Sequence, residues 1–282
     1  MPAFLSWWRR GLTDPAAERR ARFFESLHYA IRRTRFYGNF KPPSRSDERA
    51  VLAKLPKVPL SDYLRCSERF EVPGVPGTTP AELRYPLGKP PRTAILGQNI
   101  RGGLRVRQFQ DYRSKALTAF APAALAGPLD ALRGLAQGIE RREIVWKPLT
   151  HALLVHTDLL RGPLPATDRD FLWRVFQVPV FEQFHGSAGE LLAWECEVHD
   201  GLHLEYANVI FEQDGGGQLL ASFLANRRAP VFRLETGLSA QIVEGRCPCG
   251  TSSPRLINLQ RLSTAPYTLI PAKAALAMVN SQ

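Results

Sequence analysis

Two short pairs of potential metal ligands constrain the fold of this chain more than any other feature of its sequence. Cys196 and His199 are three residues apart, and Cys247 and Cys249 flank a proline and precede Gly250. Structural zinc takes four ligands, mostly thiolate and imidazole, in a tetrahedron. A single ion bound by both pairs would join segments that are distant in the chain. The spacing predicts a structural zinc site in which protein side chains fill every ligand position.

Several neighbouring residues bear on this ligand set. His203 could replace His199, whereas Cys66 is expected to be an ordinary thiol. Asp200 and Glu195 are close enough in sequence to hydrogen-bond the ligating imidazole and fix its tautomer. The alternative is that the cysteines are buried or free thiols without a metal, because free cysteine is common in protein cores.

Positive charge is concentrated in the first part of the chain. Residues 1–115 carry 23 of the 37 Lys and Arg residues but only 10 of the 26 Asp and Glu residues. A basic surface of this kind suits anionic partners such as nucleotides, coenzyme A, nucleic acid or anionic lipid. An arginine-rich overall composition is the alternative explanation.

The sequence contains neither a membrane-spanning segment nor a secretory signal. No apolar run approaches the length of a transmembrane helix. The N-terminus, MPAFLSWWRR, lacks a long apolar stretch and a small-residue cleavage site. We therefore expect a cytoplasmic protein, in which reduced cysteines favour metal binding over disulfides.

The pattern of apolar residues predicts a mixed α/β fold (α+β) in two parts. Residues 1–141 form a basic, helix-rich region with a Pro/Gly-rich loop at 72–92, and residues 142–282 form an α/β core with a β-hairpin and the zinc-binding subdomain. The expected elements are helices from Pro15 to near Gly38, over 111–125 and over 167–176, and strands over 144–146, 151–160, 178–184, 202–211 and 219–224.

Four segments resemble the phenylacetate-coenzyme A ligase-like enzymes of the adenylate-forming, AMP-binding superfamily. They are PVFEQFHGS, WECEVHDGLHLE, APVFRLETGL and CPCGTSSPR, and they occur in the family's order between Val178 and Arg255. The resemblance implies the family's N-domain-like α/β core with a zinc-bearing β subdomain, and in some relatives the C-x-x-H and CPC residues bind zinc. It also implies truncation, because much of the first subdomain and the C-terminal lid are expected to be absent.

The resemblance places a nucleotide site after the strand that ends near His185. In the family's YG-x-TE motif the threonine and glutamate face phosphate and metal. Matching through Gly186 places His185 at the tyrosine, Ala188 at the threonine and Gly189 at the glutamate. Glu190 lies one position late and could substitute if the loop shifts.

A second family motif, R-Y-R-TGD, is also incomplete here. Matching through Thr236 and Gly237 places Leu238 at the aspartate that binds the ribose hydroxyls, and leucine cannot accept hydrogen bonds. Arg233 remains of the arginines. The resemblance thus implies a vestigial nucleotide site at Gly186, Ser187, Thr236 and Gly237. It also makes Glu190 and Arg233 the catalytic candidates.

Three hypotheses for the function follow. The first is a degenerate ligase-like protein that does not adenylate a carboxylic acid alone and acts as an accessory or binding protein, with a possible acyl, nucleotide or CoA-type ligand or a partner enzyme. ATP and Mg²⁺ are then doubtful cofactors. The second is an active ligase or acyltransferase with a remodelled site, and the third is a zinc-stabilised nucleic-acid-binding module, which lacks a recognition motif. A hydrolase using Ser187, His185 and Asp200 is disfavoured because neighbours in sequence rarely form a triad.

Overall fold

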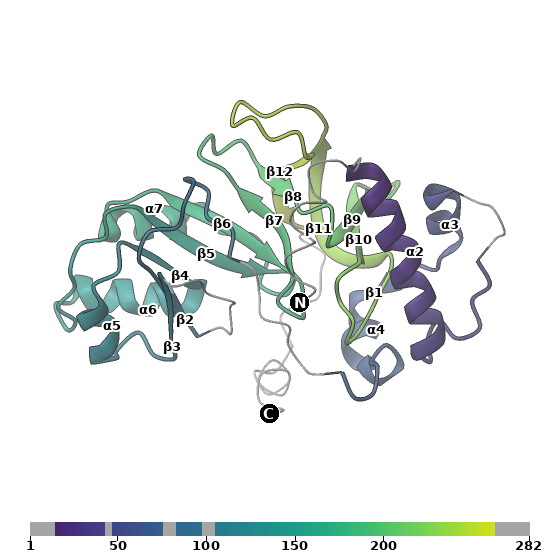
Figure 1. The fold of residues 1–282 in the computed structure, drawn as a ribbon, viewed down its shortest axis with the longest axis horizontal. Coiled ribbons are helices and arrows are strands. Elements are labelled where there is room, and N and C mark those ends of the chain that lie inside the picture. The colour runs from purple at the N-terminus through teal and green to yellow at the C-terminus, as the bar shows by residue number, and fades with distance from the viewer. Residues whose placement is uncertain (1–14, 43–46, 76–82, 98–104, 263–282) are drawn as a thin grey trace, which may run out of the picture. The chain divides into compact units, whose positions relative to one another are not determined.

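The computed structural model describes residues 15–42, 47–75, 83–97 and 105–262 (Figure 1). These residues form two compact units, called unit 1 and unit 2 below. Unit 1 is built from the described residues up to 75 together with 206–214 and 220–236; unit 2 is built from the described residues of 76–205, 215–219 and 237–262. Neither unit is continuous in sequence, so their bounds differ from the predicted division at residue 141.

Unit 1 combines short helices with strands from the second half of the chain. Its helix α2 is the predicted N-terminal helix, and Phe23, Leu27 and Ala30 on one face of it are buried. The elements of unit 1 are α2 (Pro15–Arg33), α3 (Glu48–Lys54), β1 (Val58–Pro59), α4 (Leu60–Arg65), η1 (Ser67–Arg69), β9 (Val209–Gln213), most of β10 (Gln218–Phe223) and the start of β11 (Leu234–Val243). β1 pairs in parallel with the start of β11, with Val58 opposite Leu234.

Tyr37 links the N-terminal segment of unit 1 to the later strands. Its hydroxyl donates a hydrogen bond to the carbonyl of Phe232 (3.3 Å) and accepts one from the backbone N–H of the same residue (2.9 Å). Edge-on ring contacts join Tyr37 to Phe232 and Phe70. Burial raises the pKa of Tyr37, so the phenol stays neutral. The aromatic pair at 36–37 therefore forms part of the core.

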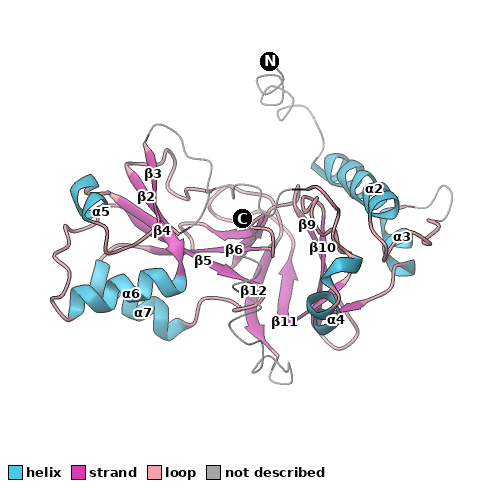
Figure 2. Ribbon diagram, turned by 90° about the horizontal axis from the view of Figure 1, so that it is seen from below, coloured by secondary structure: helices cyan, strands magenta, loops and turns pink. Residues whose placement is uncertain are grey.

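Unit 2 is organised around a mixed sheet (Figure 2). Its strand order is β3-β2-β4-β5-β6-β7-β8-β12-β11. The first five strands are parallel and the later neighbours antiparallel. The strands are β2 (Thr93–Leu96), β3 (Val106–Phe109), β4 (Ala124–Pro128), β5 (Ala152–Asp158), β6 (Val180–His185), β7 (Leu191–Glu195), β8 (Leu202–Leu204), β12 (Arg255–Arg261) and β11. The predicted mixed α/β class is confirmed.

Helices cover one face of the parallel part of this sheet. α5 (Lys115–Phe120), α6 (Leu129–Glu140) and α7 (Ala166–Phe176) lie in unit 2, and α6 and α7 are side by side in Figure 2. Leu132 and Leu172 pack with Leu153 and Val180 of the strands in one cluster. A second cluster on Ala126 and other strand residues includes the partly buried Leu83 and Tyr85. Strands buried on both sides are expected where a parallel sheet is covered.

Two predicted elements that lie wholly in unit 2 were wrong, and proline and glycine explain both; the strand predicted over 202–211 is also interrupted, since β8 ends at Leu204 and β9 begins at Val209. The helix expected over 111–125 stops at Phe120, because Ala121 is left-handed (φ 45°) and precedes a proline. β4 begins at Ala124, and a Cβ on Gly127 would lie 2.9 Å from Leu96 Cβ, so this strand requires small residues. The strand expected over 144–146 is absent from the described structure, since the segment folds back against Gly138 of α6.

No described helix has the length and apolar character needed to cross a lipid bilayer. The predicted Pro/Gly-rich loop at 72–92 lies partly outside the described residues, because 76–82 are not described. The part that is described contains no helix or strand, and β2 begins immediately after it at Thr93.

Candidate metal centre

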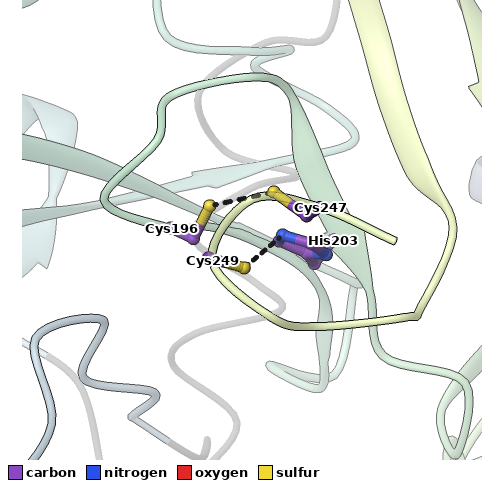
Figure 3. A group of neighbouring side chains, drawn as sticks. All are labelled: Cys196, His203, Cys247 and Cys249. Carbon is purple, nitrogen blue, oxygen red and sulfur yellow. Dashed lines mark hydrogen bonds between the residues drawn. The ribbon is translucent and has the colours of Figure 1, made fainter. Parts of the chain in front are cut away.

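Three cysteines and one histidine of unit 2 converge on one point (Figure 3). They are Cys196, His203, Cys247 and Cys249, and their donor atoms all lie within 4.8 Å of one another. The Sγ atoms of Cys196 and Cys247 are 3.8 Å apart, and His203 Nε2 lies 3.4 Å from Cys249 Sγ. Zn–S bonds of ~2.3 Å in a tetrahedron separate two sulfurs by ~3.8 Å and a sulfur from a nitrogen by ~3.6 Å. The donor spacing therefore fits one tetrahedral ion.

The structure corrects one of the four predicted ligands, because His203 and not His199 joins the three cysteines. His199 Nδ1 lies 2.9 Å from Glu195 Oε1, and its ring stacks on Phe181 with centroids 4.9 Å apart. Its backbone is left-handed (φ 55°), within the turn between β7 and β8. Glu195 also accepts a hydrogen bond from Arg169 (3.0 Å), so this carboxylate holds His199 away from the cysteine cluster.

Strand pairing explains why His203 reaches the cluster. In the antiparallel pair β7–β8, Trp194 lies opposite His203, and Glu195 lies opposite Leu202. Successive residues of a strand point to opposite faces, so His203 shares a face with Trp194, whereas Glu195 faces the other way. Trp194 stacks on His203 with ring centroids 4.9 Å apart. The pairing thus places the imidazole next to Cys196, which directly follows β7.

The other two cysteines lie in a tight turn after β11. Cys247 donates its backbone N–H to the carbonyl of Thr251 (2.9 Å) and accepts from the N–H of Gly250 (2.9 Å). Gly250 has φ +91°, which only glycine adopts without strain. The N–H of Thr251 points at Cys249 Sγ over 3.5 Å, an arrangement that stabilises a thiolate. This turn orients both sulfurs in the same direction.

Burial and hydrogen bonding set the charge of the four groups. Desolvation raises the pKa of the Cys196 thiol to about 12 and lowers the pKa of His203, so its imidazole is neutral. Burial also acts to raise the pKa of Cys249, but hydrogen bonds with Thr251, Cys247 and Cys196 together outweigh it and the pKa is lowered. A neutral imidazole and a readily ionised thiol are the forms that bind metal, and binding to the buried thiols would release protons.

The partners of His203 were not foreseen in the sequence. Its Nδ1 lies 3.2 Å from the hydroxyl of Ser253, which leaves Nε2 directed at the cluster. The Arg84 guanidinium lies 4.3 Å from the centroid of Trp194, on which His203 stacks. Asp200, one of the two expected partners, binds Arg255 instead (2.5 Å). Cys66 lies in unit 1, outside the cluster, as expected of an ordinary thiol.

The loop between β6 and β7 holds the predicted nucleotide-site residues Gly186 and Ser187 and the catalytic candidate Glu190. The buried Glu190 carboxylate accepts a hydrogen bond from the N–H of Ala188 (2.9 Å), and its carbonyl accepts one from Gly186 (2.8 Å). A Cβ on Gly186 would lie 2.4 Å from the carboxyl carbon of Glu190. The carboxylate therefore packs into its own loop, and Ser187 is exposed.

The second predicted motif lies along β11 and just before it. Arg233 binds Glu212 (3.4 Å) and donates to the carbonyl of Leu55 (3.0 Å), all within unit 1. Thr236 is buried, Gly237 has φ +68°, and Leu238 is fully buried in the strand. Arg233 thus stabilises unit 1, and Leu238 offers no side-chain hydrogen-bond acceptor.

Sequence reasoning missed His156, which lies beside His185 near the carboxyl ends of the parallel strands β5 and β6. The two buried rings have centroids 4.8 Å apart. Burial lowers the pKa of His185 to about 4 and lowers that of His156 well below its ordinary value, so both are neutral. His185 Nδ1 contacts the carbonyl of Gln183, and Asp200 binds Arg255, an arrangement unlike that of a catalytic triad. The sequence signal that could have indicated His156 is a polar residue near the end of an apolar strand.

This sheet and hairpin arrangement is similar in fold to that of a solved CoA ligase. No family model matches the sequence, and no curated protein matches it.

Similar solved structures include those of 2-hydroxyisobutyryl-CoA ligase. In complex with 2-HIB-AMP and CoA, its open conformation aligns with a TM-score of 0.63 at 15% identity, covering 84% of this chain and 67% of that one. Its postadenylation state aligns with a TM-score of 0.64 at 15% identity, covering 84% of this chain and 65% of that one. Its thioesterification state aligns with a TM-score of 0.63 at 18% identity, covering 88% of this chain and 69% of that one. The chain thus spans about two thirds of these ligases, and the likeness is one of fold.

Proposed function

We propose that this chain is a phenylacetate-CoA ligase-like protein that does not form acyl-adenylates alone and acts as an accessory or ligand-binding protein in a biosynthetic pathway. The observation that carries the proposal is the position of Glu190. Its carboxylate, the acidic group of the loop over residues 186–190, is buried and bound to Ala188 N–H. Adenylate formation needs a carboxylate available for the metal ion that accompanies ATP.

Leu238 supports the same conclusion. It is fully buried at the position that matches the ribose-binding aspartate of the resembled family. Leucine can accept no hydrogen bond from a ribose hydroxyl, and an unpaired buried hydroxyl costs ~1–3 kcal/mol. ATP would therefore lose both a metal-binding group and a ribose contact.

Binding of a CoA-type, nucleotide or acyl ligand remains part of the proposal. Ligands of open α/β sheets bind outside the carboxyl ends of the parallel strands. His156 and His185 stand near that edge as neutral imidazoles, which can donate and accept hydrogen bonds. The ligase of similar fold binds an acyl-adenylate and CoA in its crystal structures.

The metal centre completes the proposal as a structural zinc site. Cys196, His203, Cys247 and Cys249 would supply all four ligands of a tetrahedral zinc ion, which would leave no position for a substrate or a catalytic water. Three sulfurs and one imidazole nitrogen are a donor set typical of zinc. The ion would join the end of β7 and strand β8 to the turn after β11.

ATP–pyrophosphate exchange with aryl and fatty acids tests the missing adenylation. We expect the purified chain to give only background exchange. Exchange above background in the wild type that disappears in Glu190→Ala would contradict the proposal and favour an active ligase with a remodelled site. Glu197→Ala, which removes an exposed carboxylate of the same unit, is the matched control.

Metal content tests the zinc centre. Protein purified under reducing, chelator-free conditions should carry one zinc per chain, and Cys247→Ser should lose it. Cys66→Ser should retain the metal, because Cys66 lies outside the cluster. Wild-type protein without zinc, or equal loss in both variants, would refute the assignment.

A further inference from the structure

The lining of a basic pocket in unit 1 includes no residue of the cysteine cluster or of the predicted nucleotide site. The pocket lies between the end of α2 and the loop that follows η1, and its volume is about 560 Å³. Ligand pockets commonly measure ~300–1,000 Å³. The charged side chains that line it are four arginines and two glutamates: Arg32, Arg33, Arg35, Arg228, Glu68 and Glu71. We propose that this basic pocket binds a small phosphate ester that also carries hydroxyl groups, such as a sugar phosphate.

Three of the four arginines that line the pocket, Arg32, Arg33 and Arg35, differ from other basic residues of unit 1 in their ion pairing. Elsewhere in unit 1 basic side chains form ion pairs, as in Arg19–Glu48 (3.1 Å) and Arg65–Asp62 (2.6 Å). Within the part of the chain that the structure describes, Arg32, Arg33 and Arg35 form no ion pair; Arg33 lies 6.0 Å from the Tyr29 ring. These guanidinium groups are available to a ligand.

Helix stabilisation does not account for all of these arginines. Arg32 and Arg33 lie in the last turn of α2, where cations interact favourably with the helix dipole. Arg35 and Arg228 lie outside that helix and have no such role. The partial negative charge of the helix end and the two glutamates oppose anion binding. The four guanidinium groups carry more positive charge than these negative charges together.

Backbone hydrogen bonds hold the walls of the pocket in place. The N–H of Phe36 donates to the carbonyl of Arg69 (2.9 Å), and the N–H of Val72 donates to the carbonyl of Arg228 (2.7 Å). Gly74 has φ +78° in the turn closed by Val75 N–H and the carbonyl of Val72 (3.4 Å). A site that is already formed loses less conformational entropy when a ligand binds.

The mixture of charges specifies the chemistry of the ligand. A guanidinium group binds phosphate oxygens with two parallel hydrogen bonds. Glu68 and Glu71 would repel a bare anion, but as hydrogen-bond acceptors they would bind hydroxyl groups. A phosphate ester of a sugar supplies both kinds of group and has a suitable size.

The test is calorimetric titration of the full chain with ribose 5-phosphate, inorganic phosphate and ribose. Ribose 5-phosphate should bind more tightly than either of the others. Arg32→Gln/Arg35→Gln should weaken this binding about tenfold or more. Arg49→Gln/Lys54→Gln removes the same charge from exposed positions of α3 and should leave it unchanged.

The glutamates give an independent readout. Glu71→Gln should weaken the binding of ribose 5-phosphate but strengthen the binding of inorganic phosphate, because it removes a repulsive charge. Circular dichroism should show that the variant retains the fold. Absence of ribose 5-phosphate binding, or equal losses in the two double variants, would overturn the proposal. These results do not depend on adenylation, because ATP–pyrophosphate exchange tests residues of unit 2 and this pocket lies in unit 1.

Discussion

Replacing His203 by glutamine tests the reassigned ligand directly. Structural zinc binds with about 10–16 kcal/mol of free energy, an average of about 2.5–4 kcal/mol for each of four ligands. At 1.36 kcal/mol per tenfold change, loss of one ligand weakens zinc affinity roughly 70- to 900-fold. His203 is fully buried, so the neighbouring residues cannot easily supply a substitute donor.

His199→Gln is the matched control for this change. His199 lies beside the cluster but contacts Glu195 and Phe181, and its side chain is 39% exposed. We expect its loss to lower the free energy of unfolding by only about 0.5–1.5 kcal/mol, the value of one hydrogen bond, and to leave zinc affinity unchanged.

The assay is competition for zinc with a chromophoric chelator at neutral pH under reducing conditions. Circular dichroism with excess zinc shows whether each variant folds, and Cys249→Ser provides a second ligand variant at a less buried position. The ligand assignment fails if His199→Gln weakens zinc binding as much as His203→Gln does, or if neither change alters it.

Three further predictions concern other contacts. Ser253→Ala removes the partner of His203 Nδ1, so zinc affinity should fall about tenfold with the fold retained; an unchanged affinity in the chelator assay would contradict this role. Tyr37→Phe leaves the Phe232 N–H and carbonyl without their side-chain partner, and urea titration should show a loss of about 1–3 kcal/mol, whereas no loss would argue against the observed pairing. His185 is neutral in the folded protein, with a pKa of about 4, but takes up a proton near pH 6.5 when the chain is unfolded. The free energy of unfolding should therefore fall as the pH drops from 6.5 to 4, on the order of 3 kcal/mol for this group. In His185→Gln the free energy of unfolding should depend less steeply on pH than in the wild type, and an equal slope would refute the prediction.

The sequence predicted the cysteines of the candidate metal site better than its histidine. The two cysteines around a proline, followed by glycine, correctly indicated a turn that presents both sulfurs. The choice between His199 and His203 depended on the register of β7 against β8, because pairing with Trp194 places His203 on the side of the cluster. Short spacing favoured His199, but the carboxylate of Glu195 binds that residue on the other side.

The fold shows the same division between local and long-range information. The helical spacing of apolar residues predicted α2 and α7, and a continuous apolar run predicted β5. The composition of unit 1 could not be predicted, because it depends on pairing between Val58 and Leu234, which are far apart in sequence. The basic pocket also depends on such a contact, between Val72 and Arg228.

The discontinuity of unit 1 has a consequence for synthesis on the ribosome. Phe23 and Tyr37 emerge early, but both pack on Phe232, which is made much later. At about 5–20 residues per second, the intervening residues 76–205 take roughly 7–26 s to translate. During that interval Phe23 of α2 lacks its later partner Phe232, whereas the parallel strands of unit 2 are already complete enough to pair. The nascent N-terminal segment is therefore a natural substrate for chaperones until residue 236 has left the ribosome.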